Sequence, residues 1–299
     1  MKTSNSSNLA LDQVDELGWQ VVSPYLIPLK RVNIHGAELT YVEQGDGPMV
    51  VLVHGELGDF RTWSAQMSVL SCQYRVVSYS RRYHEPNLLP DGEIDYTYRR
   101  HIDDLICLIE KLGPGHAHLV GHSYGATVAA LVAMERPDRV NSLILREPSL
   151  FSMLSASLDK VSLRLHAVAL NVLQKLSENG EQQLAAREYV NIVVGKDVFD
   201  ELTSEDRLVI NQNAHTLGPM LRTYFEPTSL DQSTASKMTT PTLLISGELS
   251  PRIYQAISRE LHNCLPVAES LTLPGASHGL HMDKGGDVGV SVMEFLSRN

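Results

Sequence analysis

The chain lacks several features that would mark other classes of protein. It has three cysteines in 299 residues (Cys72, Cys107 and Cys264), too few and too far apart for a disulfide framework or a paired-cysteine zinc site. No run approaches the eighteen or so apolar residues that a membrane-spanning helix needs. Phosphate-binding glycine loops, dinucleotide fingerprints and helical His-Glu-x-x-His pairs are also missing, so we expect no cofactor and no metal.

Positive charge is scarce as well. The 25 Lys and Arg residues face 35 Asp and Glu residues, a formal net charge of -10, so nucleic acid and anionic membranes would be repelled. A small-molecule substrate is the expected partner, and the oligomeric state stays open. Met1 to Gln20 is polar and acidic and lacks the apolar segment of a signal peptide, which together with the unpaired cysteines predicts a cytoplasmic protein.

Alternating apolar patterns predict an α/β fold. With 43% hydrophobic residues, the chain can bury one large core with an insertion. A hairpin is expected over 29–43, and apolar runs predict further strands at 49–53, 75–79, 116–120, 140–145, 241–247 and 270–273. Helices are expected at 60–70, from an N-cap at Asp95 to 112, from Tyr124 to about 136, and at 253–261 and 287–296. Such alternation predicts a mostly parallel, doubly wound sheet covered on both faces.

The alternation stops between residues 150 and 237, where only helical patterns are found. We predict a lead-in at 1–26, a core domain formed by 27–149 and 238–299, and an inserted all-helical cap at 150–237. Three patterns define the cap: a shorter stripe at Ala185, Tyr189 and Ile192, a capping box at Thr203 to Asp206, and a long apolar stripe expected to serve in helix packing. The long stripe comprises Leu154, Leu158, Val161, Leu165, Val168, Val172 and Leu176.

The most informative motif is Gly121-His122-Ser123-Tyr124-Gly125, which follows an apolar run and precedes small, helix-compatible residues. The glycines permit the close passage of a strand and the helix that leaves it. The Ser123 hydroxyl would then stand at a helix N-terminus, where free N–H groups stabilise developing negative charge. The pattern therefore predicts an acyl-transfer nucleophile.

From Leu29 to its C-terminus, the chain resembles α/β-hydrolase-fold proteins with a helical cap. The resemblance rests on the His54-Gly55 loop, the elbow at Ser123 and the late loop Ala276-Ser277-His278-Gly279. It implies Ser123 as nucleophile and His278 as its base. It also implies an oxyanion hole made by the backbone N–H groups of Tyr124 and Glu56. The Glu56 side chain is expected to face solvent or pair with Arg81 or Arg82; alternatively, it disfavours anionic substrates.

The acid departs from the family's pattern. Most members carry an Asp after the seventh core strand, but the turn here reads Gly247-Glu248-Leu249-Ser250-Pro251, with Ser250 at the expected position. A serine can hold an imidazole but cannot offset the charge of an imidazolium. Some members carry the acid one strand earlier, where Glu147 stands. Glu147 is the predicted acid, Glu248 and Asp283 are its rivals, and the absence of any acid is a further alternative.

These observations predict a cofactor-free serine hydrolase that acts on a small, largely apolar carboxylic ester, or on a related C–C or amide bond, through an acyl-enzyme. One alternative keeps the fold but changes the chemistry to that of a lyase, cyclase or perhydrolase. Another is a ligand receptor whose triad has decayed. Polar contacts to the substrate are expected from Asn211, Gln212 and Asn213.

Overall fold

The computed structural model describes residues 27–280 and 285–299, except residues 91, 93, 114, 155, 156 and 196. The predicted lead-in at 1–26 and the rival acid Asp283 lie outside the described residues.

The core is an eight-stranded sheet of order β1-β2-β4-β3-β5-β6-β7-β8. The β1–β2 and β2–β4 pairs are antiparallel and the other pairs are parallel, so the predicted fold class is confirmed. The predicted strands are all present, with ends that differ from the predicted ones by at most two residues. Their bounds are β1 Lys30–Ile34, β2 Ala37–Gln44, β3 Met49–Val53, β4 Arg75–Tyr79, β5 Ala117–His122, β6 Val140–Arg146, β7 Thr242–Gly247 and β8 Ala268–Leu273.

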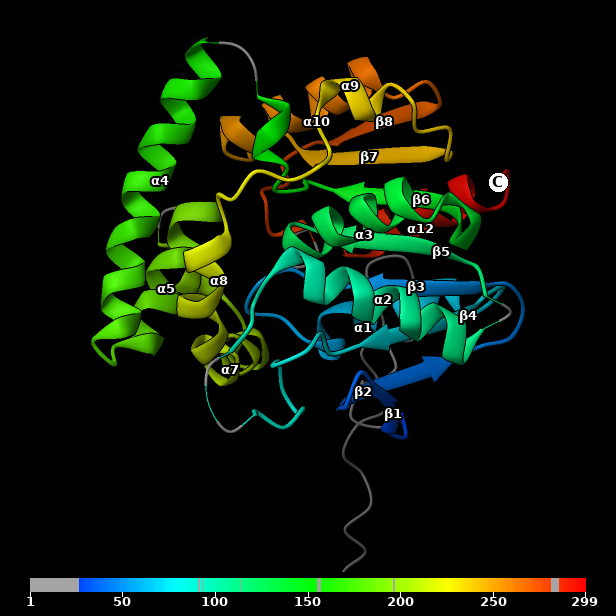
Figure 1. The fold of residues 1–299 in the computed structure, drawn as a ribbon, viewed down its shortest axis with the longest axis horizontal. Coiled ribbons are helices and arrows are strands. Elements are labelled where there is room, and N and C mark those ends of the chain that lie inside the picture. Colours follow the sequence, from blue (N-terminus) through cyan, green and yellow to red (C-terminus); the bar gives the residue numbers. More distant parts are fainter. Residues whose placement is uncertain are drawn as a thin grey trace, which may run out of the picture.

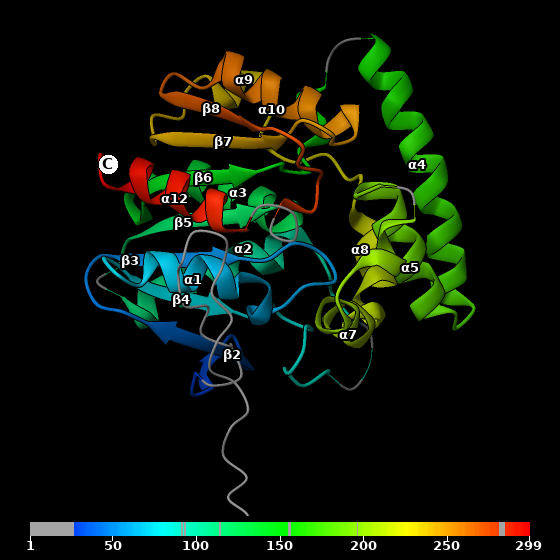
Figure 2. The same cartoon turned by 180° about the vertical axis from the view of Figure 1, so that it is seen from behind.

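Helices cover both faces of this sheet. α2 (Tyr98–Leu112) and α3 (Tyr124–Glu135) lie on one face (Figure 1), and α1 (Ser64–Leu70) and α12 (Gly285–Leu296) on the other (Figure 2). Because side chains alternate along a strand, neighbouring residues serve different cores: in β5, Leu119 packs toward α3 and Val120 toward α1. α10 (Arg252–Cys264) packs on the α3 side.

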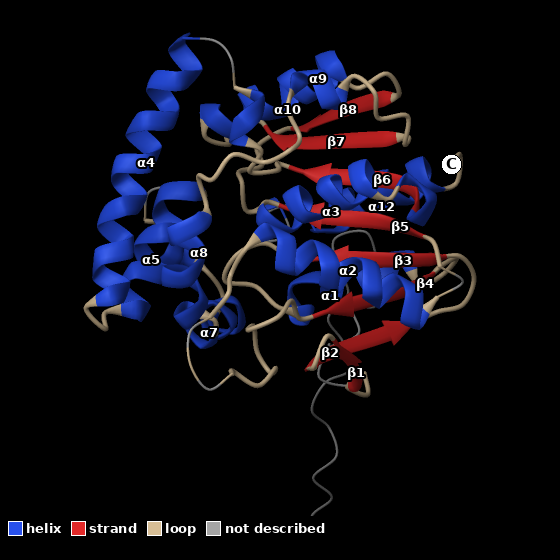
Figure 3. Cartoon of the chain, viewed as in Figure 1, coloured by secondary structure: helices blue, strands red, loops and turns tan. Residues whose placement is uncertain are grey.

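Between β6 and β7 the described chain forms helices and loops but no strand. The division into a core and a cap at residues 150 and 237 remains a prediction. The inserted helices are η4 Phe151–Met153, α4 Ser157–Glu178, α5 Gln182–Val193, α6 Val198–Glu201, α7 Ser204–Gln212, η5 Ala214–Thr216, α8 Leu217–Thr223 and α9 Gln232–Ala235. Of these helices, α4, α5, α7 and α8 lie beside the carboxyl ends of the parallel strands, whereas α9 lies beside α10 (Figure 3). Within the described part of the chain, no helix combines the length and the apolar character needed to cross a bilayer.

Two local predictions were wrong. The side chain that caps α2 is Thr97, which accepts a hydrogen bond from the Arg100 N–H; Asp95 instead accepts one from the Thr97 hydroxyl. The long stripe of α4 does not serve helix packing along its length, because four of its members are exposed: Val161, Leu165, Val168 and Val172. α4 packs instead through a second apolar face that includes Leu170 and Leu173.

Candidate active site

Ser123 lies at the sharp corner between β5 and α3. Its backbone is in the left-handed region, with φ +51° and ψ −118°, a conformation that costs a non-glycine residue of order 1–3 kcal/mol. The flanking glycines make the corner possible. A Cβ on Gly125 would collide with the carbonyl oxygens of Val53 and His54, and one on Gly121 would lie 2.5 Å from the Cα of Ala126. The predicted elbow is therefore present in the backbone.

His278 and Glu147 reach Ser123 from two other loops. The His278 Nε2 lies 3.1 Å from the Ser123 Oγ, and its Nδ1 lies 2.5 Å from the Glu147 Oε2. The three side chains are buried, and Glu147 has no exposed surface. Glu147 comes directly after β6 and, like Ser123, has a positive φ, of +48°. Residues 155 positions apart in the sequence thus form one hydrogen-bonded chain.

The other candidate acids lie elsewhere. The Glu248 carboxylate accepts a hydrogen bond from the exposed Gly275 N–H. Ser250, at the family's usual acid position, is buried, and no hydrogen-bond partner for its hydroxyl lies among the described residues. The loop after β7 still supports the acid through its backbone, because the Gly247 N–H donates to the Glu147 Oε1 at 2.8 Å. Of the acids described, Glu147 is the one in contact with the imidazole.

The loop predicted to form the oxyanion hole passes beside Ser123. A Cβ built on Gly55 would lie 3.4 Å from the Cβ of Ser123, and Glu56 is the next residue. Tyr124 is the first residue of α3, so its N–H has no helical acceptor four residues earlier. Both predicted amide donors therefore come from backbone that adjoins the Ser123 hydroxyl.

The Glu56 carboxylate is buried and fully engaged. Its Oε2 receives hydrogen bonds from the Tyr96 hydroxyl at 2.6 Å and from the Arg81 guanidinium at 3.2 Å, and its Oε1 receives one from the Thr216 hydroxyl at 2.6 Å. The expected pairing with Arg81 is present, whereas Arg82 pairs with Asp104. Because Arg81 balances its charge, Glu56 adds no unpaired negative charge beside the predicted oxyanion hole.

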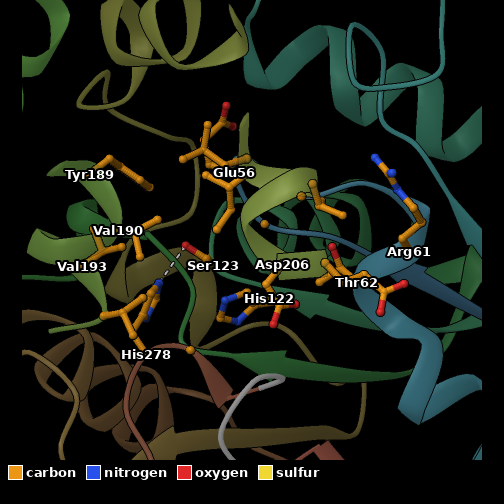
Figure 4. A pocket seen from close by; sticks show the side chains of 18 of the residues that line it. Glu56, Arg61, Thr62, His122, Ser123, Tyr189, Val190, Val193, Asp206 and His278 are labelled. Atoms are coloured by element: carbon orange, nitrogen blue, oxygen red, sulfur yellow. Dashed lines mark hydrogen bonds between the residues drawn. The ribbon is translucent and has the colours of Figure 1, made fainter. Parts of the chain in front are cut away.

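Ser123 and His278 open onto a cavity of about 160 Å³ (Figure 4). Tyr189, Val190 and Val193 of α5 lie beside these two side chains (Figure 4). The helical insertion also lines the cavity with Val194, Val209 and Ile210 and with the acidic residues Glu205 and Asp206. Arg61 and Thr62 lie on the side away from His278. The volume is close to that of an engineered cavity of about 150 Å³ that holds benzene, so the enclosed part of a ligand is small.

The expected polar contacts from Asn211, Gln212 and Asn213 are not found, because none of these residues lines the cavity. Asn211 and Gln212 are exposed. Asn213 is buried and joins the insertion to the core: its amide donates to the Asp59 carboxylate and accepts from the Glu85 N–H, both at 2.8 Å.

Three residues beside Ser123 and His278 did not stand out in the sequence. The Ser149 Oγ lies 3.4 Å from the Ser123 Oγ and 2.8 Å from the Tyr224 hydroxyl. The Tyr254 ring stacks on His278, with centroids 3.9 Å apart and planes inclined by 19°. Burial raises the pKa of Tyr224 and of Tyr254, so both phenols stay protonated near neutral pH. Of the three, only Ser149 could have been found from the sequence, because it follows the predicted acid Glu147 by two residues.

The comparison with known families agrees with this geometry. A family model described as alpha/beta hydrolase fold matches residues 48–285, and the chain belongs to this family.

Individual relatives point to hydrolysis. The chain is 27% identical over 256 residues to 2-(acetamidomethylene)succinate hydrolase of Mesorhizobium japonicum, covering 83% of this chain and 88% of that protein. It is 26% identical over 286 residues to epoxide hydrolase 3 of Xenopus tropicalis, covering 90% of this chain and 77% of that protein. Several other curated relatives are matched over less than half of their own length. These relatives support hydrolase activity in general.

The fold likeness extends to solved structures. A hydrolase from Pseudomonas aeruginosa PA01 superposes with a TM-score of 0.75 at 20% identity, covering 90% of this chain and 98% of that one. At this level of identity the likeness shows a shared fold.

Proposed function

We propose that the protein is a serine hydrolase of small carboxylic esters that works through an acyl-enzyme. The observation that carries this proposal is the continuous hydrogen-bonded chain from Ser123 through His278 to Glu147, set on a backbone corner with positive φ. Serine is a weak nucleophile without a base within hydrogen-bond reach, and His278 Nε2 is such a base.

The geometry supports a two-step reaction. His278 takes the Ser123 proton as the Oγ attacks the ester carbonyl carbon, and the N–H groups of Tyr124 and Glu56 receive the developing oxyanion. The C–O bond to the leaving alcohol breaks as His278 returns the proton to that alcohol. Water, deprotonated by His278, then attacks the acyl-enzyme and releases the acid. Glu147 holds the imidazole with its Nδ1–H toward the carboxylate and its Nε2 toward Ser123.

Epoxide hydrolysis suits this nucleophile less well. An attack of the Ser123 oxygen on an epoxide carbon would leave an ether, which water does not readily cleave, whereas attack on an ester leaves an ester that water can hydrolyse. A receptor with a decayed triad is also disfavoured, because such a protein would not need to keep two residues of the site, Ser123 and Glu147, in costly positive-φ conformations. The apolar wall of α5 suits a short acyl group.

A fluorophosphonate probe and p-nitrophenyl acetate and butyrate test the proposal. We expect covalent labelling of the wild type, turnover of at least one ester with an initial burst, and loss of both in Ser123→Ala. The Ser152→Ala variant is a matched control, because Ser152 is bonded to Thr228 and Leu230, away from the triad. Undiminished ester hydrolysis by Ser123→Ala would refute the assignment.

A further inference from the structure

A line of buried hydroxyl groups runs from the nucleophile into the helical insertion. The Ser149 Oγ lies 3.4 Å from the Ser123 Oγ, the Tyr224 hydroxyl lies 2.8 Å from Ser149, and the Tyr254 hydroxyl lies 3.5 Å from Tyr224. Each of these side chains is at most 3% exposed. Tyr224 follows α8 of the insertion, so the line joins the two parts of the molecule at the reacting atom.

The direction of hydrogen bonding along this line follows from proton counting. A hydroxyl has one proton to donate, and Ser123 gives its proton to His278, whose Nδ1–H is held by Glu147. The contact between the Ser123 and Ser149 hydroxyls is therefore a hydrogen bond only if Ser149 is the donor. Ser149 must then accept from Tyr224, and Tyr224 from Tyr254. The one arrangement that fills every contact points toward the Ser123 oxygen.

We propose that Ser149 is a catalytic hydrogen-bond donor to Ser123, and that Tyr224 positions it. This inference rests on the proposed serine-hydrolase function. The donor acts when the second tetrahedral intermediate collapses: the bond between the acyl carbon and Ser123 Oγ breaks, His278 delivers its Nε2 proton to that oxygen, and Ser149 donates a hydrogen bond without losing its own proton.

The two half-reactions use this donor unequally. During deacylation the Ser123 oxygen changes from an ester oxygen, which is a weak acceptor, into a departing oxygen that gains negative charge, so the hydrogen bond strengthens in the transition state. During acylation the same oxygen starts as an alcohol that already accepts this bond and ends as an ester oxygen. Acylation therefore gains little from Ser149, whereas deacylation gains the strengthened bond.

The test compares kcat with kcat/KM for p-nitrophenyl butyrate, an activated ester whose turnover we expect to be limited by deacylation. Stopped-flow measurement of the burst gives both half-reactions. For Ser149→Ala we expect deacylation and kcat to fall about five- to tenfold, KM to fall in proportion, and kcat/KM to stay within about twofold. Tyr224→Phe should shift the same quantities in the same direction by a smaller factor. Ser152→Ala serves as the control, because the Ser152 hydroxyl is bonded to Thr228 and to the Leu230 carbonyl; this variant should leave kcat and kcat/KM unchanged.

Equal losses in kcat and kcat/KM, or no loss in kcat, would overturn the inference, because a structural role would not separate the two half-reactions. If Ser149→Ala fails to fold by circular dichroism, Tyr224→Phe decides on the same criterion. The proposed function fails by a different result, namely retained activity in Ser123→Ala. If Ser123→Ala is inactive but Ser149→Ala and Tyr224→Phe change kcat and kcat/KM equally, only the donor role is refuted.

Discussion

Replacing Glu147 with Gln tests the choice of acid most sharply, because the structure predicts a specific defect. The Gly247 N–H must keep an acceptor, so the carbonyl oxygen of the new amide faces Gly247 and its NH₂ group faces His278 Nδ1. An imidazole nitrogen that meets a donor has to act as an acceptor, which moves the ring proton to Nε2. His278 would then present an N–H to Ser123 where a base is required.

The expected loss is large. The same tautomer error in a serine protease triad costs about 10⁴-fold in kcat, and loss of the carboxylate also leaves the imidazolium uncompensated. We expect kcat/KM of Glu147→Gln for p-nitrophenyl butyrate to fall about 10³- to 10⁴-fold, which corresponds to about 4–5.5 kcal/mol of transition-state stabilisation. Thermal unfolding should be followed in parallel, so that misfolding is not mistaken for lost catalysis.

Two matched variants complete the experiment. Glu248→Gln removes a carboxylate that contacts the Gly275 amide, and Ser250→Ala removes a hydroxyl without a hydrogen-bond partner among the described residues. Both should stay within about threefold of wild type, since effects away from the reacting groups are small. A Glu147→Gln enzyme within tenfold of wild type, or a Glu248→Gln enzyme equally impaired, would contradict our reading of the triad.

Two further predictions concern the cavity and the effect of acid. Val193→Phe places a larger side chain in the cavity, so kcat/KM for p-nitrophenyl butyrate should fall at least about tenfold while kcat/KM for p-nitrophenyl acetate changes little. Equal losses for the two esters would contradict binding of the acyl group beside Val193. Burial lowers the pKa of His166 to about 4, and positive charge on His278 lowers it in the same direction. In the unfolded chain His166 takes up a proton near its ordinary pKa of about 6.5, whereas in the folded protein it stays neutral down to about pH 4. The neutral His166 therefore adds fully to the free energy of unfolding above about pH 6.5, and this stabilisation is lost as the pH falls toward 4. It amounts to at most about 3 kcal/mol. His166→Phe should therefore lose less stability than wild type between pH 7 and pH 4.5 in urea titrations; parallel losses would contradict this assignment.

Most of the fold could be predicted because the buried strands are continuous apolar runs. Met49–Val53 is buried along its whole length, so its pattern left little choice. The exposed stripe on α4 could not be predicted, since the helix has apolar residues on two faces, represented by Val168 and Leu170. Helical spacing identifies each face but does not say which one the rest of the chain covers.

The site was predictable to the extent that it depends on local sequence. Gly121, Ser123 and Gly125 act within one turn, and the spacing alone reveals their geometry. Tyr224 and Tyr254 lie 101 and 131 positions after Ser123 and carry no motif, so only the packing of the insertion against α10 reveals them.

The position of the acid follows from the order of the strands. β6 lies between β5, which ends at the nucleophile, and β7, where most of the family carries its acid. A carboxylate on β6 is thus one strand closer to Ser123, and the positive φ of Glu147 turns it toward His278. The loop after β7 does not supply the carboxylate that contacts His278 but donates the Gly247 N–H to it. Ser250→Asp in a Glu147→Gln background therefore asks whether a carboxylate in the loop after β7 reaches the imidazole. Recovery of more than about tenfold in kcat/KM would show that the loops after β6 and β7 are interchangeable sources of the acid. No recovery would show that the loop after β7 serves only as backbone support.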